Sequence, residues 1–290
     1  MLNGEALQHV SDTAIWIATY RALESRRKRP LFQDPFADLL VGGRGKEMAK
    51  NAGLAAGVHW SVVIRTCVID DYLKEAIARG TSTILNLGAG LDTRPYRMQL
   101  PRDLLWIEVD FPDVLALKES ALKDQVPSCQ LRRLKMDLAD GPLRRKAFAE
   151  INSQGGDVLI LTEGVIPYMT ADAAGELARD LFRSPRFKLW VTDYFSPVFM
   201  AMQKKSQLQK VLKNTPFQFF PENWEAHYKN NGWQLQELRY LADVGKARNR
   251  PAPMPWRTRL AMMLGRGPNP DMLRRALGYA ILTRVADFTG

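Results

Sequence analysis

The sequence predicts an α/β protein built on a doubly wound, mostly parallel sheet of seven strands. Short apolar runs recur along the chain with helical or loop segments between them, and the first run ends in the glycine-rich turn Gly88-Ala89-Gly90. Such runs are typical of strands buried on both faces, and their alternation with crossover segments favours right-handed parallel connections. With 290 residues, of which 46% are hydrophobic, the chain can bury one large core, with or without a cap.

Residues 1–80 are expected to form a helical N-terminal extension packed on the core. Residues 12–27 place apolar side chains at three- and four-residue steps, and Asp34-Pro35 introduces a second, short helix. Residues 58–79 predict a longer amphipathic helix that ends at Gly80, a residue suited to the C-terminal capping position.

Residues 81–290 are expected to hold the sheet. The predicted strands are residues 83–87, 104–109, 130–136, 157–162, 187–193, 233–238 and 279–285. The first five alternate with crossovers, and the last two are interpreted as an antiparallel pair. Two stretches, residues 196–222 and 240–277, do not fit a minimal sheet, and we interpret them as lid or substrate-shaping insertions because long irregular connections are usually functional or mobile.

A nucleoside site is predicted where the first two strands end. The turn Gly88-Ala89-Gly90 is expected to aim free amides at a ligand, and Asp110 ends the next apolar run. A carboxylate about twenty residues past the second glycine can accept hydrogen bonds from both ribose hydroxyls. The dinucleotide fingerprint needs a third glycine, and Thr93 stands there instead. A nucleoside cofactor without a pyrophosphate, such as S-adenosyl-L-methionine, is therefore favoured over NAD.

Five segments between residue 11 and about residue 195 resemble a known family. They are residues 13–26, Asp34-Pro35-Phe36-Ala37, Arg65-Thr66, residues 86–97, and Thr162-Glu163-Gly164 with Tyr168. In this order they resemble the leucine carboxyl methyltransferase family, whose bacterial members include many small-molecule O-methyltransferases. The resemblance implies the Rossmann-like fold of class I methyltransferases and S-adenosyl-L-methionine as cofactor. It fades past residue 195, where a substrate would be chosen.

The resemblance also implies roles for four cofactor-binding side chains. Arg65 matches an arginine that pairs with the methionine carboxylate, which a guanidinium can hold through two parallel hydrogen bonds. Glu163 would face the amino group or the sulfonium of the same cofactor. Asp137 and Leu138 would lie against adenine, with Asp137 accepting from its exocyclic amine. The alternatives are structural: an exposed helical arginine for Arg65, a turn-forming aspartate for Asp137, and a helix cap for Asp110.

The segment after the glycine turn has a structural interpretation. Asp92 or Thr93 is expected to cap the following helix, with a proline in its first turn. Arg94 and Arg97 are expected to neutralise neighbouring strand-end acids. Arg21, in the first predicted helix, is a candidate second clamp for cofactor or substrate.

Methyl transfer from a sulfonium is an in-line displacement that requires a well-placed acceptor oxygen and the exclusion of water. A carboxylate acceptor is already ionised near neutral pH, whereas a phenol benefits from a general base. Bases are scarce, because the chain has three histidines, and His227 is the best candidate since it precedes the penultimate strand. Tyr168 is expected to orient the substrate oxygen or the cofactor, with packing as the alternative. These features favour a small acidic acceptor, and a phenol or enol stays open.

Composition narrows the class of protein. A formal net charge of +10 favours acidic partners, but no nucleic-acid-binding module is recognisable among the basic clusters. No apolar run approaches the roughly eighteen residues of a membrane span, and the N-terminus lacks a signal-peptide pattern. The two cysteines, Cys67 and Cys129, have neither disulfide-framework nor zinc-site spacing, so no metal is expected. A cytoplasmic protein fits best, and its oligomeric state is not predicted.

Three alternatives to a small-molecule O-methyltransferase stay open. The family's namesakes methylate a protein C-terminal carboxylate, which makes a protein substrate the first alternative. The glycine turn and Asp110 alone also suit an NAD(P)-dependent oxidoreductase. A non-catalytic protein that binds S-adenosyl-L-methionine or RNA is the third.

Overall fold

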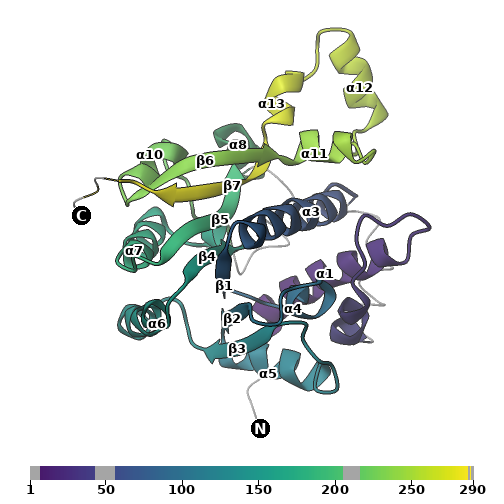
Figure 1. Cartoon of the computed structure of the whole chain (residues 1–290). Coiled ribbons are helices and arrows are strands. Elements are labelled where there is room, and N and C mark those ends of the chain that lie inside the picture. Colours follow the sequence, from purple (N-terminus) through teal and green to yellow (C-terminus); the bar gives the residue numbers. More distant parts are fainter. Residues whose placement is uncertain (1–6, 43–55, 205–215, 287, 289–290) are drawn as a thin grey trace.

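The computed structural model describes residues 7–42, 56–204, 216–286 and 288. Seven strands form one sheet through the middle of the molecule, in the order β3-β2-β1-β4-β5-β7-β6 (Figure 1). They are β1 Thr81–Leu87, β2 Leu105–Asp110, β3 Gln130–Lys135, β4 Asp157–Thr162, β5 Phe187–Phe195, β6 Trp233–Tyr240 and β7 Leu277–Arg284. The pairs from β3 to β5 are parallel, and β7 is antiparallel to both β5 and β6. The predicted strands and the antiparallel final pair are confirmed.

Strand β5 ends later than predicted, because its pairing with β7 continues past the apolar run. The predicted fifth strand stops at residue 193, but β5 continues to Phe195, where it pairs with Leu277 of β7. The apolar run marks only the buried part of a strand, whereas an antiparallel hydrogen-bond ladder extends wherever both backbones remain alongside each other. This extension places Asp193 inside the ladder, directly opposite Tyr279.

Helices cover both faces of the sheet (Figure 1). One face packs against α6 Gly141–Ser153, α7 Ala171–Phe182 and α10 Trp224–Lys229, in an apolar cluster that includes Phe148, Leu177 and Trp190. The other face packs against α3 Ala56–Ala78 and α11 Leu241–Ala247. Three short elements follow the ends of β1, β2 and β4: α4 Arg94–Arg97, α5 Pro112–Ala121 and the 3₁₀ turn η2 Ile166–Tyr168. Two covered faces explain why the central strands are almost continuously apolar.

The N-terminal extension has its own small apolar cluster. Helix α1 Leu7–Ser25 begins five residues before the predicted start, and a second helix spans residues 35–42. Asp34 begins that second helix by accepting a hydrogen bond from the Ala37 amide at 3.1 Å. Ile15, Leu40, Leu91 and Leu122 pack together, which joins both helices to the segments that follow β1 and α5. Gly80 ends the α3 region with a positive φ of 102°, as its capping role requires.

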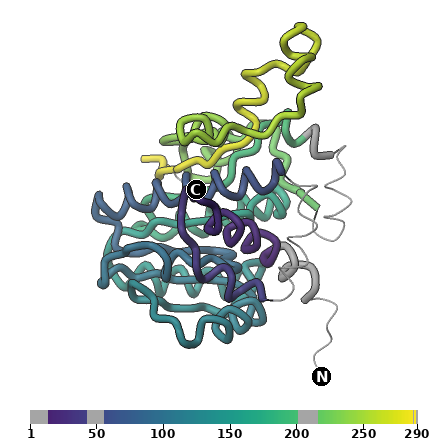
Figure 2. Tube along the Cα trace, turned by 90° about the vertical axis from the view of Figure 1, so that its right-hand side faces the viewer, coloured from purple at the N-terminus to yellow at the C-terminus, as the bar shows by residue number. Residues whose placement is uncertain are grey.

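The second insertion forms an arm that rises from the sheet edge (Figures 1 and 2). It contains α11, α12 Trp256–Met263 and α13 Pro270–Arg274. No residue of α12 is buried, and Trp256 is 69% exposed. The first insertion begins with α8 Pro197–Lys204, and part of it lies outside the described residues. Among the helices that the structure describes, none combines the length and apolar character needed to cross a bilayer.

Candidate functional site

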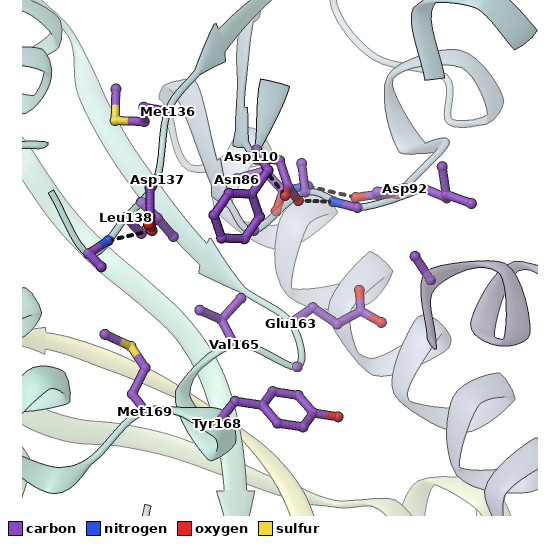
Figure 3. Close-up of a pocket in the computed structure, with 18 of the residues that line it drawn as sticks. Asn86, Asp92, Asp110, Met136, Asp137, Leu138, Glu163, Val165, Tyr168 and Met169 are labelled. Atoms are coloured by element: carbon purple, nitrogen blue, oxygen red, sulfur yellow. Dashed lines mark hydrogen bonds between the residues drawn. The ribbon is translucent and has the colours of Figure 1, made fainter. Parts of the chain in front are cut away.

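A cavity of about 480 Å³ opens where β1, β2, β3 and β4 end (Figure 3). This is the edge of a parallel sheet at which doubly wound folds bind ligands. Its walls contain nearly all the site residues predicted from sequence, namely Arg65, Gly88, Ala89, Gly90, Asp110, Asp137, Leu138, Glu163 and Tyr168. No described residue of the second insertion contributes to these walls.

The amides of the glycine turn are occupied by hydrogen bonds to the end of β2, which corrects the expectation of free amides. The Gly88 and Ala89 amides donate to the Val109 carbonyl at 2.8 and 3.1 Å, and the Gly90 amide donates to Asp110 Oδ2 at 2.6 Å. Both glycines have positive φ values, 66° and 45°. A Cβ at residue 88 would lie 2.4 Å from a methyl group of Val165, so only glycine lets β1 and the 163–169 segment approach this closely. The turn offers a ligand close backbone approach rather than donors.

Asp110, the last residue of β2, is a buried carboxylate beside the glycine turn. Its other oxygen, Oδ1, accepts from the Phe111 amide at 2.7 Å, and the residue is 7% exposed. Burial raises the pKa of this carboxyl group, while the two backbone amides and Lys118 oppose that rise. An ionised carboxylate has about four acceptor positions, so two backbone donors leave capacity for two ribose hydroxyls. Figure 3 places Asp110 at the upper wall of the cavity, beside Asn86.

Two arginines hold Glu163 at the opposite wall. Its oxygens lie 2.9 Å from Arg65 Nε and 2.8 Å from Arg94 Nη1. Burial opposes ionisation of Glu163, but Arg94 and Arg65 outweigh it and lower the pKa of Glu163 below its ordinary value. Arg94 also binds Asp70 and Asp92, at 2.7 and 2.9 Å. The expected neutralisation of a strand-end acid by Arg94 is therefore present.

Arg65 keeps an unused donor. Its Nε forms an ion pair with Glu163 Oε1 at 2.9 Å, yet this buried atom makes no hydrogen bond of good geometry with the described residues. A buried guanidinium donor without a partner is costly, so the site favours an additional acceptor. A ligand carboxylate in the cavity supplies one.

The expectations for the segment around the turn have different outcomes, and the role of Arg21 as a clamp stays a prediction. Arg97 pairs with Asp70 of α3, at 2.7 Å, and not with a strand-end acid. Of the two capping candidates, Thr93 makes no capping bond, because its hydroxyl donates to Asp34 at 2.7 Å, whereas Asp92 Oδ1 accepts from the Arg94 amide at 2.9 Å. Arg21 lines the cavity, but its Nε donates to the same Asp34 at 2.8 Å and its Nη2 to the Leu91 carbonyl. These side chains fasten the N-terminal extension to the glycine turn, which is a structural role.

The wall after β3 is largely apolar. Asp137 is exposed and accepts from the Ala139 amide at 2.8 Å, so it forms a local turn while its second oxygen makes no hydrogen bond within the described chain. The Leu138 carbonyl is held by the buried Arg144, a contact that sequence analysis missed. Met136 and Met169 add apolar surface beside Leu138 (Figure 3). A flat apolar ring with a polar edge suits this wall.

The two predicted catalytic residues lie in different places. Tyr168 lines the cavity from η2, its ring lies 5.2 Å from the ring of Phe217, and burial raises its pKa. His227 does not line the cavity: it lies on α10 and packs against Phe219 at a ring separation of 5.0 Å. Burial, followed by the charge of Arg179, lowers the pKa of His227. Proximity in sequence to the penultimate strand did not bring His227 to the strand ends, because α10 packs on the face of the sheet.

A second cavity of about 200 Å³ lies on the other side of residues 163–169, and sequence analysis missed its polar residue, Asp193. Asp193 accepts from the Gly164 amide at 2.9 Å and from the Tyr279 hydroxyl at 2.6 Å. Burial raises its pKa to about 6, although these donors and Arg65 oppose the shift. The available signal was a lone carboxylate near the end of the apolar run of β5.

Comparisons with known proteins identify the family. The family model for leucine carboxyl methyltransferase matches residues 14–182, more than half of the chain. A proposed S-adenosyl-L-methionine-dependent methyltransferase from Mycobacteroides abscessus is 34% identical over 187 residues, and this match spans 59% of the chain and 61% of that relative. A second such protein, from Frankia alni, is 28% identical over 260 residues, which cover 84% of the chain and 90% of the relative.

Solved structures support the fold. A proposed methyltransferase from Thermobifida fusca superposes with a TM-score of 0.57 over 94% of both chains, at 15% identity. A DUF574 family protein from Streptomyces avermitilis superposes with a TM-score of 0.54 over 93% of this chain and 97% of that one, also at 15% identity. At this identity the likeness shows the fold, here the seven-stranded sheet of class I methyltransferases.

The residues of the first cavity fit the cofactor that these relatives have in common. Asp110 offers acceptors for ribose hydroxyls, the wall at Leu138 suits adenine, and Arg65 Nε, which is ion-paired with Glu163 without a well-formed hydrogen bond, suits a carboxylate. Among the described residues, no group of His, Cys, Asp or Glu side chains is arranged to hold a metal ion. The chain belongs to the leucine carboxyl methyltransferase family.

Proposed function

We propose that this protein transfers the methyl group of S-adenosyl-L-methionine to an oxygen atom of a small metabolite. The observation that carries the proposal is a single cavity whose walls hold residues suited to both ends of this cofactor. Asp110 and the glycine turn suit the nucleoside, and the Arg65–Glu163 pair suits the zwitterionic amino acid end. A second cavity adjoins the first along residues 163–169 and offers room for an acceptor.

Charge complementarity supports the proposed placement of the amino acid end. The cofactor carboxylate would take the free Nε donor of Arg65, and its ammonium would face Glu163. Glu163 stays anchored by Arg94 when Arg65 turns to the ligand, because the two arginines bind different oxygens of its carboxylate. Each ionic group then keeps a partner, which limits the cost of taking charges out of water.

The bound cofactor supplies an electrophilic methyl group on sulfur. The chain's part is to hold the acceptor oxygen in line with that methyl group and to exclude water. Tyr168 lines the first cavity and packs on Phe217, and Phe217 in turn packs on Phe195 of the second cavity at 5.7 Å. We assign Tyr168 the role of orienting the acceptor between the two cavities.

A small acceptor is favoured over a protein terminus by the size and character of the second cavity. It measures about 200 Å³, and apart from Asp193 its described walls are apolar. A polypeptide end carries backbone amides and carbonyls that need partners when buried, and these walls offer few.

Parallel calorimetric titrations with S-adenosyl-L-methionine, S-adenosylhomocysteine and NAD test the cofactor. We expect micromolar binding of the two sulfur nucleosides and none of NAD. Transfer of label from methyl-labelled cofactor to a panel of phenols and carboxylic acids then tests O-methylation. Binding of NAD alone would reinstate the oxidoreductase alternative, and cofactor binding without transfer to any oxygen acceptor would contradict O-methylation.

A further inference from the structure

The second cavity combines apolar walls with one carboxylate. Its walls come from η2, the end of β5, α8 and the segment before α10, and include Phe195, Met200, Phe219 and Trp224. Asp193 is the one ionisable side chain among its described lining residues, and it is 4% exposed. A carboxylate placed among apolar side chains is energetically unfavourable, so such an arrangement points to a function.

Asp193 is held in place by donors from two other elements. The Tyr279 hydroxyl donates to Oδ1 at 2.6 Å, and the Gly164 amide lies 3.2 Å from Oδ1 and 2.9 Å from Oδ2. The Tyr279 contact is fixed by the sheet, because Asp193 and Tyr279 are directly opposite in the antiparallel β5–β7 register. Both groups donate, so the carboxylate acts as an acceptor and retains lone pairs for a further donor.

The position of Asp193 links the two cavities. Gly164 lines the cofactor cavity, and its amide donates to Asp193, which lines the second cavity. One peptide therefore separates the proposed methyl donor from the carboxylate. An acceptor that extends from the second cavity towards the first would pass close to Asp193, and a general base must lie within hydrogen-bond reach of the acceptor oxygen.

Ionisable groups face Asp193 from five elements. They are Arg65 of α3, Glu163 after β4, Tyr168 of η2, Tyr228 of α10 and Tyr279 of β7. Arg65 is the cation in this set, and Glu163 and the cofactor carboxylate compete for it. Because burial raises the pKa of Asp193 to about 6, the group is ionised at neutral pH and is more basic than an exposed aspartate. A base with a pKa near the working pH is the most effective for proton transfer.

We propose that Asp193 is the general base for a hydroxyl acceptor, and that the second cavity binds an apolar phenol or enol and excludes carboxylates. The inference rests on the proposed methyl transfer. In the reaction the acceptor O–H bond breaks and its proton passes to the Asp193 carboxylate. The acceptor oxygen forms a bond to the methyl carbon while the carbon–sulfur bond breaks, and that electron pair stays on sulfur, which leaves S-adenosylhomocysteine. A carboxylate acceptor needs no base and would meet the like charge of Asp193 in an apolar cavity.

Binding of a matched phenol and carboxylate tests the selectivity. We would titrate the full-length protein, saturated with S-adenosylhomocysteine, with β-naphthol and with β-naphthoate between about pH 5 and about pH 8. Naphthol should bind more tightly as pH rises through about 6, because ionised Asp193 accepts its hydroxyl hydrogen, and naphthoate should bind more weakly. Asp193→Asn should flatten both pH profiles. Tyr279→Phe removes a donor that lowers the Asp193 pKa and should shift both profiles to higher pH.

Turnover tests the base directly. With naphthol as acceptor, Asp193→Asn should lower kcat by about a hundredfold or more, and KM should rise because the carboxylate that accepts the naphthol hydroxyl is lost. Tighter binding of naphthoate than naphthol near neutral pH, no binding of either probe, or full activity in Asp193→Asn would overturn the inference. The titration with S-adenosylhomocysteine distinguishes failure of the proposed function from failure of the proposed role of Asp193. If the wild-type protein does not bind S-adenosylhomocysteine, the proposed function fails. If it binds and any of these results appears, only the role of Asp193 fails.

Discussion

Two lysine–carboxylate pairs join α5 to the sheet with almost the same length and opposite burial. Lys118 Nζ lies 2.6 Å from Glu108 Oε1, and both side chains are fully buried. Lys135 Nζ lies 2.7 Å from Glu119 Oε2, and these side chains are 45% and 37% exposed. The chain thus provides a matched control for the effect of burial on an ion pair.

Replacing each lysine by methionine should separate the two cases. Lys118→Met leaves Glu108 buried with Arg133 as its remaining partner, at 2.9 Å. Removing one partner of a buried pair costs about 3–5 kcal/mol, and the remaining arginine places the loss near about 3 kcal/mol. Lys135→Met breaks an exposed pair and should cost about 0–1 kcal/mol, because water solvates the released carboxylate.

Urea unfolding at neutral pH measures both values, with the wild-type protein as reference. A further variant, Lys118→Met with Glu108→Met, should be more stable than Lys118→Met alone, because no buried carboxylate is left short of a partner and Arg133, 15% exposed, still donates to the Tyr96 hydroxyl at 2.7 Å. Equal losses for the two single variants, or a double variant that is less stable than Lys118→Met, would refute the reasoning from burial.

The remaining predictions concern the site and the buried titratable groups. Asp110→Ala should weaken S-adenosyl-L-methionine binding about a hundredfold or more, through the loss of two charge-assisted hydrogen bonds, while the exposed Asp113→Ala should leave calorimetric affinity unchanged. Arg65→Ala should weaken S-adenosyl-L-methionine far more than adenosine, and equal losses would argue against carboxylate pairing. The Asp193 pKa is raised from 3.8 to about 6, so its contribution to stability is fully present below about pH 4 and is lost as pH rises through about 6. In urea unfolding, the wild-type protein should therefore lose about 3 kcal/mol relative to Asp193→Asn over that interval, and parallel curves would contradict this. Both cysteines are buried, and burial raises their thiol pKa values to about 12 and about 11, so a thiol reagent should react with neither until the protein unfolds.

The positions of the strands and most of the candidate site could be predicted because their signals are local. Seven apolar runs with turn residues between them suffice to place the strands, and the carboxyl ends of parallel strands converge on one edge of the sheet. Asp110 and Glu163 each end such a run, so both could be placed at that edge from sequence alone. The resemblance added Arg65, which no periodic pattern distinguishes from other helical arginines.

Contacts between distant segments could not be predicted, because they depend on register and helix packing. Arg94 pairs with three carboxylates contributed by α3, the glycine turn and the end of β4, and only the folded arrangement brings these together. His227 is displaced from the strand ends by the packing of α10 on the sheet face. A sequence pattern reports which face of an element is buried, but not which side chains meet there.

The sequence by itself determined the sheet, the glycine turn with the carboxylate Asp110 at the next strand end, and the family. Only the tertiary structure decided which base stands beside the cofactor cavity. Sequence analysis found bases scarce and favoured a carboxylate acceptor, whereas the β5–β7 register sets Asp193 opposite Tyr279, 86 positions later in the chain. Burial at this position makes Asp193 more basic than an exposed aspartate. Burial depends on the folded surroundings of a residue, so the sequence around residue 193 does not reveal it.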